Sequence, residues 1–356
     1  MKNSKIHKNF QLNEKSFSSV AELLLFSKTI SDAVFLFLSD WFSANDFVKV
    51  TTSGSTGKPA VIVLKKEFMK NSALATGDFF DVQENTTALL CLPVAYIAGK
   101  MMLVRALVLG WHLDVVKPTS KPLKGIEKTY DFSAMVPMQL QNSVEELHII
   151  KKLIVGGGVV IKEVEAQLQS LKTNVFATYG MTETITHVAV RKLNNFGSVE
   201  LASGAHYKIL SDITISQDDR GCLVIDAPKI SDTQIITNDM VQLVSNVEFD
   251  WLGRFDNVIN SGGVKLHPEQ IEKKLSALIF QRFFVAGVSD SLLGEKLVLL
   301  IEGTAKNDIS DKVMRLKTLS TFEKPKEIYF IHKFIETKTK KIQRNKTLDI
   351  WIKEHE

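Results

Sequence analysis

The amino-acid sequence predicts an α/β fold, in which a large N-terminal α/β domain with a β-rich subdomain is followed by a small α+β domain. Short apolar runs rich in β-branched residues alternate with longer amphipathic segments up to about Gly197, a pattern typical of mostly parallel strands joined by helices. Beyond Gly197, apolar and polar residues alternate between turns that contain Gly, paired Asp and Pro, which is typical of a β-rich segment. After Trp251 a Gly-rich turn, a helix and further strands predict a separate small domain.

Six apolar runs in the first part of the chain end in turn residues, as buried strands do. These expected strands are residues 48–54, 60–64, 87–94, 113–116, 151–157 and 173–180. The intervening segments with the spacing of amphipathic helices are 65–77, 98–110 and 161–171. In the last part of the chain, Pro268 and Glu269 open a helix, and we expect strands at 283–289 and 296–303.

Length and composition predict a globular protein of two domains. With 356 residues, 45% of them apolar and 24% charged, the chain can bury a sizeable core and is long for a single module. The change of pattern after Trp251 places the domains at residues 1–254 and 255–356. The 44 Lys and Arg residues barely outnumber the 40 Asp and Glu residues, so the net charge of +4 does not indicate nucleic-acid binding.

The cysteines and the longest apolar stretches point to a cytoplasmic protein. Cys91 and Cys222 lie far apart and outside any CxxC pair, so we expect small core residues in a reducing compartment and neither a disulfide framework nor a thiolate zinc site. The stretches 21–42 and 101–116 are interrupted by charged residues and lack the ~20 uninterrupted apolar residues of a membrane span.

A loop with the composition of a phosphate-binding site follows the first expected strand. Residues 51–60 read TTSGSTGKPA, where two glycines and several small hydroxyl residues let backbone N–H groups approach an anion closely. This is not a Walker A loop, because only two residues separate Gly54 from Gly57 and Pro59 follows the lysine. A flexible surface turn is the alternative interpretation of the same composition.

A second polar segment, TYGMTET at 178–184, ends another expected strand. The ring of Tyr179 is suited to stack on a base, and the carboxylate of Glu183 is suited to hold Mg²⁺ on a phosphate. The alternative is a loop that leads into a helix, with Thr182 as its N-cap.

Two further segments combine charge with turn residues. In the segment 253–272, Arg254 and Asp256 either mark a hinge or, beside Asp239, present charged groups to a phosphate and a ribose. The basic run at 337–346 is by default a solvated face, and composition does not single out one of its lysines.

Motifs of several other enzyme classes are missing from the sequence. The eight histidines show no HExxH or other metal-ligand spacing, and there is no GxSxG segment. The GGG at 156–158 is not a GxGxxG fingerprint. The sequence therefore gives little support to a zinc site, a serine hydrolase or a nicotinamide-dependent enzyme.

The order of the motifs resembles that of the adenylate-forming acyl-CoA ligase (ANL) superfamily, from about residue 47 to the C-terminal end. The segments that carry the resemblance are TTSGSTGKP at 51–59, LPVAYIAG at 92–99, LIVGGG at 153–158, TYGMTET at 178–184, TNDMV at 237–241, the hinge segment at 253–272 and the lysine motif at 324–344. The resemblance implies the adenylate-forming enzyme fold, with a small mobile C-terminal domain.

The resemblance also implies which residues bind ATP. Those expected to hold the β- and γ-phosphates are Thr52, Ser53, Gly54, Ser55, Thr56, Gly57 and Lys58. Those expected around the AMP moiety are Gly156, Gly157, Gly158, Tyr179 and Gly180 at the adenine, and Asp239 and Arg254 at the ribose. As catalytic residues, Thr182 would touch the α-phosphate and Glu183 would coordinate Mg²⁺.

The remaining roles implied by the resemblance concern the reaction itself. Lys341 would be the catalytic lysine that bridges the substrate carboxylate and the α-phosphate. Asp256 would be the hinge, and Gly262 and Gly263 would line the tunnel for the thiol of CoA. ATP, CoA and a small carboxylic acid would be the substrates, with Mg²⁺ as the cofactor and no nucleic acid as a partner.

Within the superfamily, the short length, the LIVGGG triplet and the segment YGMTETITHVA are most similar to the o-succinylbenzoate–CoA ligases of menaquinone biosynthesis. This similarity implies 2-succinylbenzoate as the acid. The expected acyl pocket consists of Tyr96, Ala98, Thr186, His187 and Arg191. A dianionic acid needs a cation or several donors near its second carboxylate, which His187 or Arg191 would supply.

Three alternatives stay open beside this interpretation. One is an adenylate-forming ligase for another aryl or acyl acid, and one is a ligase with a carrier-protein thiol as acceptor. The third is a non-catalytic nucleotide-binding relative. A homo-oligomer is left open as well.

Several positions depart from the family pattern. Only residues 1–50 precede the phosphate loop, where most relatives have a much longer region. Ala60 replaces a lysine, Tyr96 stands where a histidine is common, and Asn238 replaces the glycine of a T-G-D motif. The glycines beside the catalytic lysine are replaced by Lys338 and Lys340.

Overall fold

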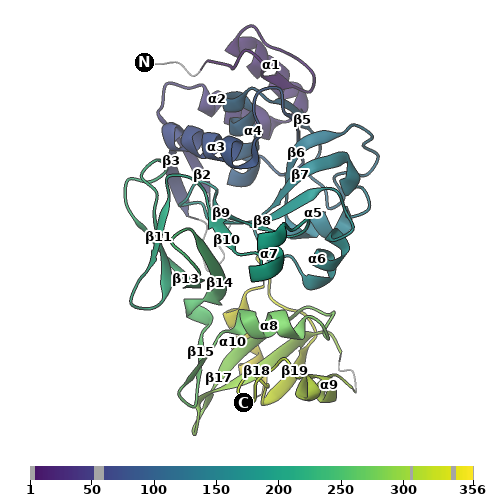
Figure 1. Cartoon of the computed structure of the whole chain (residues 1–356), viewed down its shortest axis with the longest axis vertical. Coiled ribbons are helices and arrows are strands. Elements are labelled where there is room, and N and C mark those ends of the chain that lie inside the picture. Colours follow the sequence, from purple (N-terminus) through teal and green to yellow (C-terminus); the bar gives the residue numbers. More distant parts are fainter. Residues whose placement is uncertain (1–4, 52–59, 305–307, 338–341, 356) are drawn as a thin grey trace.

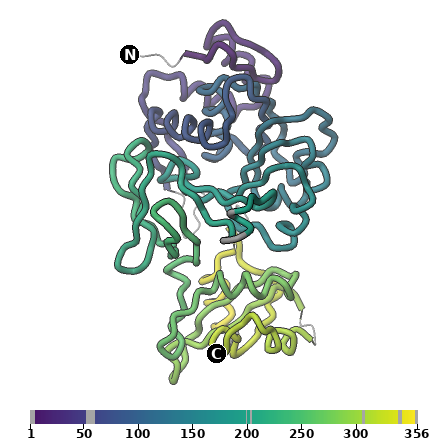
Figure 2. The backbone as a smooth tube through the Cα atoms, in the orientation of Figure 1, coloured from purple at the N-terminus to yellow at the C-terminus, as the bar shows by residue number. Residues whose placement is uncertain are grey.

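The computed structural model of the chain describes residues 5–51, 60–304, 308–337 and 342–355. A larger part that begins with the N-terminal helices is followed by a smaller part that contains the elements from β15 onward (Figure 1). The purple N-terminal helices and the yellow C-terminal elements lie at opposite ends of the long axis (Figure 2).

The helices of the described residues are α1 (Val20–Ile30), α2 (Asp32–Trp41), α3 (Lys66–Phe80), α4 (Ile97–Leu109), α5 (Pro137–Asn142), α6 (Lys162–Leu168), α7 (Ser198–Ser203), α8 (Pro268–Leu275), α9 (Ile309–Arg315) and α10 (Arg344–His355). The strands of the first part are β1 (Gln11–Leu12), β2 (Phe47–Thr51), β3 (Val61–Lys65), β4 (Thr87–Leu90), β5 (His112–Val115), β6 (Tyr130–Met135), β7 (Ile150–Val155), β8 (Asn174–Gly180), β9 (His187–Lys192), β10 (Tyr207–Ile209), β11 (Thr214–Gln217), β12 (Cys222–Asp226), β13 (Ile235–Leu243) and β14 (Glu248–Arg254). Those of the second part are β15 (Ile259–Ser261), β16 (Val264–Leu266), β17 (Phe283–Asp290), β18 (Gly294–Glu302) and β19 (Glu327–Ile331).

One sheet runs through most of the first part, in the order β1-β5-β4-β6-β7-β8-β9-β10-β14-β13-β12-β11. Along this order, every pairing from β1/β5 to β7/β8 is parallel, and every pairing from β8/β9 onward is antiparallel. The expected α/β fold is therefore confirmed, and the β-rich segment continues the parallel sheet. The change of direction occurs at the turn between β8 and β9, where the segment TYGMTET lies.

The core of the first part lies between this sheet and the helices α2, α3 and α4. Its largest fully buried side chains include Trp41, Trp111 and Phe132. Helix α4 is buried over most of its length, and Met101 and Met102 are core residues as expected. Burial of a large apolar side chain is worth about 1.5–3 kcal/mol, so this apolar helix is held mainly by packing.

Two expectations about local structure are corrected. Strands β2 and β3 form a separate antiparallel pair, in which Val61 and Val63 of β3 are 64% and 56% exposed, so they are not members of the buried parallel sheet. Residues 181–186 form turns and no helix follows them, so the alternative that made Thr182 a helix N-cap is wrong. Strand β6 lies between β4 and β7 and was not among the expected strands.

The elements after Arg254 build a second sheet with its own core. A 3₁₀ turn, η2 (Phe255–Asn257), leads into a sheet of order β16-β15-β18-β17, to which β19 adds in parallel beside β18. Apolar side chains of α8 and β18, such as Ile271 and Leu299, are buried together. The expected helix at Pro268 and the two expected strands are confirmed as α8, β17 and β18.

None of the helices in the described part of the chain combines the length and the apolar character needed to cross a bilayer. Both cysteines are buried and unbridged, as predicted.

Candidate nucleotide and acyl site

The carboxyl ends of β7 and β8 and the beginning of α4 surround a cavity of about 220 Å³, which we call the acyl cavity. Its lining consists of Leu92, Ile97, Ala98, Arg105, Ala134, Met135, Val136, Ile154, Gly156, Gly157, Thr178, Gly180, Met181, Thr182, Ile185, Thr186 and His187. A position at the carboxyl ends of parallel strands, where the strand direction changes, is a usual place for a ligand site in an α/β sheet.

The acyl cavity brings together residues predicted from separate motifs. Those that line it are Ala98, Gly156, Gly157, Gly180, Thr182, Thr186 and His187. Two of the glycines are required by the backbone: Gly157 has a φ of +83°, and a Cβ on Gly180 would collide with the carbonyl of Thr186. Gly158 follows in the same loop but is not part of the lining.

Two predicted acyl-pocket residues lie outside this lining. Tyr96 precedes α4 at its N-cap and is 42% exposed. Arg191 lies on β9, where its guanidinium pairs with Glu165 at 2.8 Å and lies 5.7 Å from the ring centre of Tyr207. The charge of Arg191 is thus engaged by Glu165 outside the cavity lining, so the structure does not bring it to the position expected beside a second carboxylate.

Arg105 supplies a cation to the cavity that sequence reasoning missed. It is 2% exposed, and its Nε and Nη2 donate to the hydroxyl oxygens of Thr76 and Thr186 at 3.2 and 3.0 Å. Among the residues that the structure describes, no carboxylate forms an ion pair with it. Burial lowers the pKa of Arg105 to about 9, which leaves the guanidinium charged at neutral pH. The only signal in the sequence is a charged residue within the apolar run of α4, and because Lys100 on the same helix is charged as well, that pattern alone does not single out Arg105.

The turn between β8 and β9 presents the polar groups expected at the α-phosphate. The buried hydroxyl of Thr184 accepts a hydrogen bond from Met181 N–H at 2.9 Å and donates one to the Thr186 carbonyl at 2.6 Å. These bonds support Ile185 in the left-handed region at φ +65°, which is strained for a β-branched residue. Thr184 is thus a positioning residue that sequence reasoning did not select.

Glu183 fits the chemistry of a Mg²⁺ ligand. Its side chain is exposed beside Thr182, and we find no hydrogen bond or ion pair to its carboxylate from any described residue. Within the described residues there is also no group of three or more His, Cys, Asp or Glu side chains arranged for a metal. A metal held by Glu183 would take its other ligands from phosphate and water, which is the usual arrangement for Mg²⁺.

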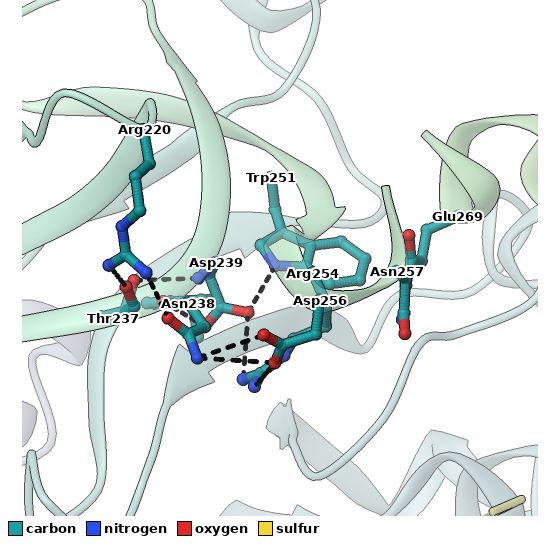
Figure 3. Close-up of polar contacts among 10 residues, drawn as sticks. Arg220, Thr237, Asn238, Asp239, Trp251, Arg254, Asp256, Asn257 and Glu269 are labelled. Atoms are coloured by element: carbon teal, nitrogen blue, oxygen red, sulfur yellow. Dashed lines mark hydrogen bonds and ion pairs between the residues drawn. The ribbon is translucent and has the colours of Figure 1, made fainter. Parts of the chain in front are cut away.

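The residues expected at the adenine and the ribose form one hydrogen-bonded cluster. Asp239 on β13 and Arg254 on β14 are cross-strand partners, and their charged groups lie 3.8 Å apart (Figure 3). The Asp239 carboxylate also accepts bonds from the Tyr179 hydroxyl at 2.7 Å and from Trp251 Nε1 at 3.2 Å. Burial and the nearby Asp239 charge raise the pKa of Tyr179, so its hydroxyl stays a donor.

The expected hinge residue, Asp256, is connected to the same strands. Its carboxylate accepts from Arg254 at 2.9 Å and lies 3.4 Å from the side-chain amide of Asn238 (Figure 3). Arg220 donates to the Asn238 carbonyl oxygen at 2.8 Å, which orients the amide nitrogen toward Asp256. The asparagine that replaces the family's glycine therefore joins β13 to the turn between the two sheets.

The expected thiol-tunnel glycines lie in the second part of the chain. Gly262 and Gly263 form the two-residue turn between β15 and β16, with φ values of +57° and +81°. Positive φ at both positions is what a tight hairpin turn needs, so a structural role alone accounts for both glycines.

The phosphate-loop residues from Thr52 to Lys58 and the lysine Lys341 lie outside the described residues. The loop is bounded by the paired strands β2 and β3. The lysine segment is bounded by Glu336 and Ile342, which pair in an antiparallel bridge. Beyond it, Arg344 forms a bidentate ion pair with the buried carboxylate of Glu272, with both bonds at 2.7 Å.

The chain is similar to known proteins over most of its length. The family model described as AMP-binding enzyme matches residues 20–231. A 2-succinylbenzoate–CoA ligase from Enterococcus faecalis is 24% identical over 94% of this chain and 75% of its own length. One from Listeria monocytogenes is 25% identical over 87% of this chain and 71% of its own length.

Solved structures agree with this similarity. An acyl-CoA synthetase (AMP-forming)/AMP-acid ligase II-like protein from Dyadobacter fermentans is 37% identical, covering 89% of this chain and 93% of its own, with a TM-score of 0.59. The o-succinylbenzoate CoA synthetase MenE from Bacillus subtilis, in complex with the acyl-adenylate OSB-AMP, is 18% identical over 83% of this chain and 68% of its own, with a TM-score of 0.72. The predicted adenylate-forming fold and the predicted family are thus both confirmed, and the chain belongs to the AMP-binding enzyme family.

Proposed function

We propose that the protein joins 2-succinylbenzoate to CoA through an acyl-adenylate, with cleavage of ATP to AMP and pyrophosphate. Its enzyme class follows from the family and the curated relatives: it is an AMP-forming acid–CoA ligase. The observation that carries the choice of acid is the buried guanidinium of Arg105 in the wall of the acyl cavity.

The buried positive charge of Arg105 is suited to bind the second carboxylate of a dicarboxylic acid. Burial of an ionised side chain without an opposite charge is costly, so a substrate carboxylate at this position would relieve that cost and form a charge-assisted pair. Thr76 and Thr186 already accept from Nε and Nη2, which leaves further guanidinium N–H groups for an anion. One carboxylate of 2-succinylbenzoate would then pair with Arg105, while the other is activated near Thr182.

The nucleotide roles in the proposal follow the cluster at the end of the sheet. The Gly156–Gly158 loop and the ring of Tyr179 would enclose the adenine, and Asp239 with Arg254 would hold the ribose. The phosphate loop would bind the β- and γ-phosphates. Mg²⁺, when bound by Glu183 and the phosphates, would supply positive charge to the reacting centre.

The proposed first step brings two anions together. The substrate carboxylate attacks the α-phosphorus, a new C–O–P linkage forms, and the bond to the leaving pyrophosphate breaks. Donors from Thr182 and the charge of Lys341 would neutralise negative charge where it develops. In the second step the thiolate of CoA attacks the acyl carbonyl, and AMP leaves.

We also propose that the chain forms two domains, residues 1–254 and 255–356, and that the second domain changes its position between the two steps of the reaction. The change from one sheet to another between β14 and β15 supports this boundary. Asp256 in the connecting turn would be the hinge, and rotation there would remove Lys341 after the first step and admit CoA past Gly262 and Gly263.

The experiment that tests the proposal measures pyrophosphate release with ATP and Mg²⁺ against a panel of acids, with and without CoA. The panel contains 2-succinylbenzoate, benzoates and fatty acids. We expect release with 2-succinylbenzoate, and formation of its CoA thioester only when CoA is present. Release with another acid at a higher kcat/KM would overturn the substrate, and pyrophosphate exchange without thioester formation would overturn CoA as the acceptor.

A further inference from the structure

A second cavity lies behind the acyl cavity. It has a volume of about 270 Å³ and lies between α3 and the segments 210–213 and 227–230, which flank β11 and β12. Its lining combines apolar side chains, such as Ala75, Leu210 and Ile230, with polar and charged residues that include Asp78, Asp212 and Lys229. Among the described residues, His187 is common to the linings of both cavities.

The ring of His187 is held in place from several sides. Nδ1 lies 3.1 Å from the Thr186 hydroxyl and Nε2 lies 3.5 Å from the Thr76 hydroxyl. Phe80 packs edge-on against the ring, with the ring centres 6.1 Å apart. Gly180 pairs with His187 across β8 and β9 and approaches its backbone so closely that there is no room for a Cβ on Gly180.

The hydrogen bonds define which nitrogen carries the proton. The Thr76 hydroxyl donates to the Ser72 carbonyl at 2.9 Å, so its oxygen can only accept from the ring. A neutral ring with the proton on Nε2 therefore satisfies both neighbours, with the Thr186 hydroxyl donating to Nδ1. Burial and the charge of Arg105 lower the pKa of His187 well below its ordinary value, which agrees with a neutral ring.

We propose that His187 is the partition that limits the size of the acid, and that the second cavity takes an apolar extension of the acid once the ring is removed. The proposal rests on the proposed function, in that the acyl cavity holds the acid. His187 lines both the cavity of about 220 Å³ and the cavity of about 270 Å³, so a smaller side chain at this position would join the two. The apolar side chains behind it favour a phenyl or alkyl group over a charged one.

The test compares two acids that differ by one phenyl group. They are 4-oxo-4-phenylbutanoate and 4-(biphenyl-4-yl)-4-oxobutanoate, and the readout is ATP–pyrophosphate exchange. We expect His187→Ala to raise the ratio of kcat/KM for the extended acid to that for the parent by about tenfold or more relative to wild type. His187→Asn, which keeps a polar side chain of smaller size, serves where His187→Ala does not fold, and a smaller rise in the same direction is expected.

A second substitution assigns the gain to the second cavity. Ala75→Phe fills that cavity from α3, so we expect it to leave wild-type exchange unchanged and to abolish the gain in the His187→Ala background. The proposal is overturned by a folded His187 variant that gains nothing on the extended acid, and equally by a gain that survives Ala75→Phe.

Failure of the proposed function can be distinguished from failure of the role proposed for His187. If wild type does not activate 2-succinylbenzoate, the same comparison is made with whichever acid of the panel it does activate and with the phenyl-extended form of that acid. A changed size limit in the His187 variants would then support the partition although the proposed acid is wrong.

Discussion

Tyr179 donates its hydroxyl hydrogen to Asp239 across 2.7 Å, which links the ring expected beside the adenine to the carboxylate expected at the ribose. Tyr179→Phe removes this bond and leaves the ring. A hydrogen bond to a charged group contributes about 1.5–3 kcal/mol, so we expect the KM for ATP to rise about tenfold, with a smaller change in kcat. Steady-state kinetics at saturating acid measures this.

Tyr207→Phe is the matched control for that substitution. Tyr207 belongs to the same aromatic cluster, where its ring stacks on Phe249 with the centres 5.5 Å apart, but its hydroxyl interacts with Arg191 and not with Asp239. An equal rise in the KM for ATP in both variants would contradict the specific role of Tyr179.

Thr184 holds the turn that carries Thr182 and Glu183, so its hydroxyl is expected to matter for both stability and activity. Thr184→Val keeps the shape of the side chain but leaves the Met181 N–H without its acceptor. We expect a loss of about 1–3 kcal/mol in the free energy of unfolding, measured by urea denaturation, together with slower pyrophosphate release. Thr184→Ser retains the hydroxyl and should keep most of the stability and most of the rate of pyrophosphate release. Equal losses in the Val and Ser variants would indicate that Thr184 acts through the packing of its methyl group and not through its hydroxyl.

The ion pair between Arg344 and Glu272 is expected to position the lysine proposed to be catalytic, because Arg344 follows Lys341 by three residues and Glu272 anchors Arg344 to α8. We expect Glu272→Gln to slow formation of the adenylate more than the transfer of a supplied acyl-adenylate to CoA, because the proposed role of Lys341 is confined to the first half-reaction. Single-turnover measurements of the two half-reactions provide the test.

Lys274→Met is the control on the same helix. It removes another ion pair of α8, in which Lys274 and Glu323 lie 2.6 Å apart, without touching the lysine segment. We expect any loss of activity in this variant to be equal in the two half-reactions. If Glu272→Gln slows both half-reactions equally as well, the pair supports only the fold.

The sequence predicted the parallel part of the fold because each buried strand ends in turn residues and each helix between strands keeps its period. It did not predict the pairing of β2 with β3, since a short apolar run has the same appearance in a buried parallel strand and in an exposed hairpin. Strand β6 was not predicted because Asp131 and Ser133 alternate with the apolar residues of Tyr130–Met135, whereas the strands expected in this part of the chain were continuous apolar runs.

Some residues of the candidate site could likewise be predicted from the sequence, and others could not. Residues in contiguous motifs, such as Gly156 and Thr182, could be named because their order along the chain resembles that of a known family. Arg105 could not be named, since its importance depends on burial and on the lack of an ion-pair partner among the residues that the structure describes, which only the packed structure reveals. The pairing of Arg191 could not be predicted for the same reason, because its partner Glu165 lies 26 residues away in the sequence.

Recognition of the second carboxylate of the acid by Arg105 would be visible in the substrate preference of the enzyme. The measurement is kcat/KM for 2-succinylbenzoate and for 4-oxo-4-phenylbutanoate, an analogue that keeps the aliphatic carboxylate and lacks the one on the ring, in wild type and in Arg105→Met. We predict that wild type prefers the dianion about 100-fold or more and that Arg105→Met loses most of that preference, because the discrimination comes from one charged pair. An unchanged preference in a folded Arg105→Met protein would contradict the account.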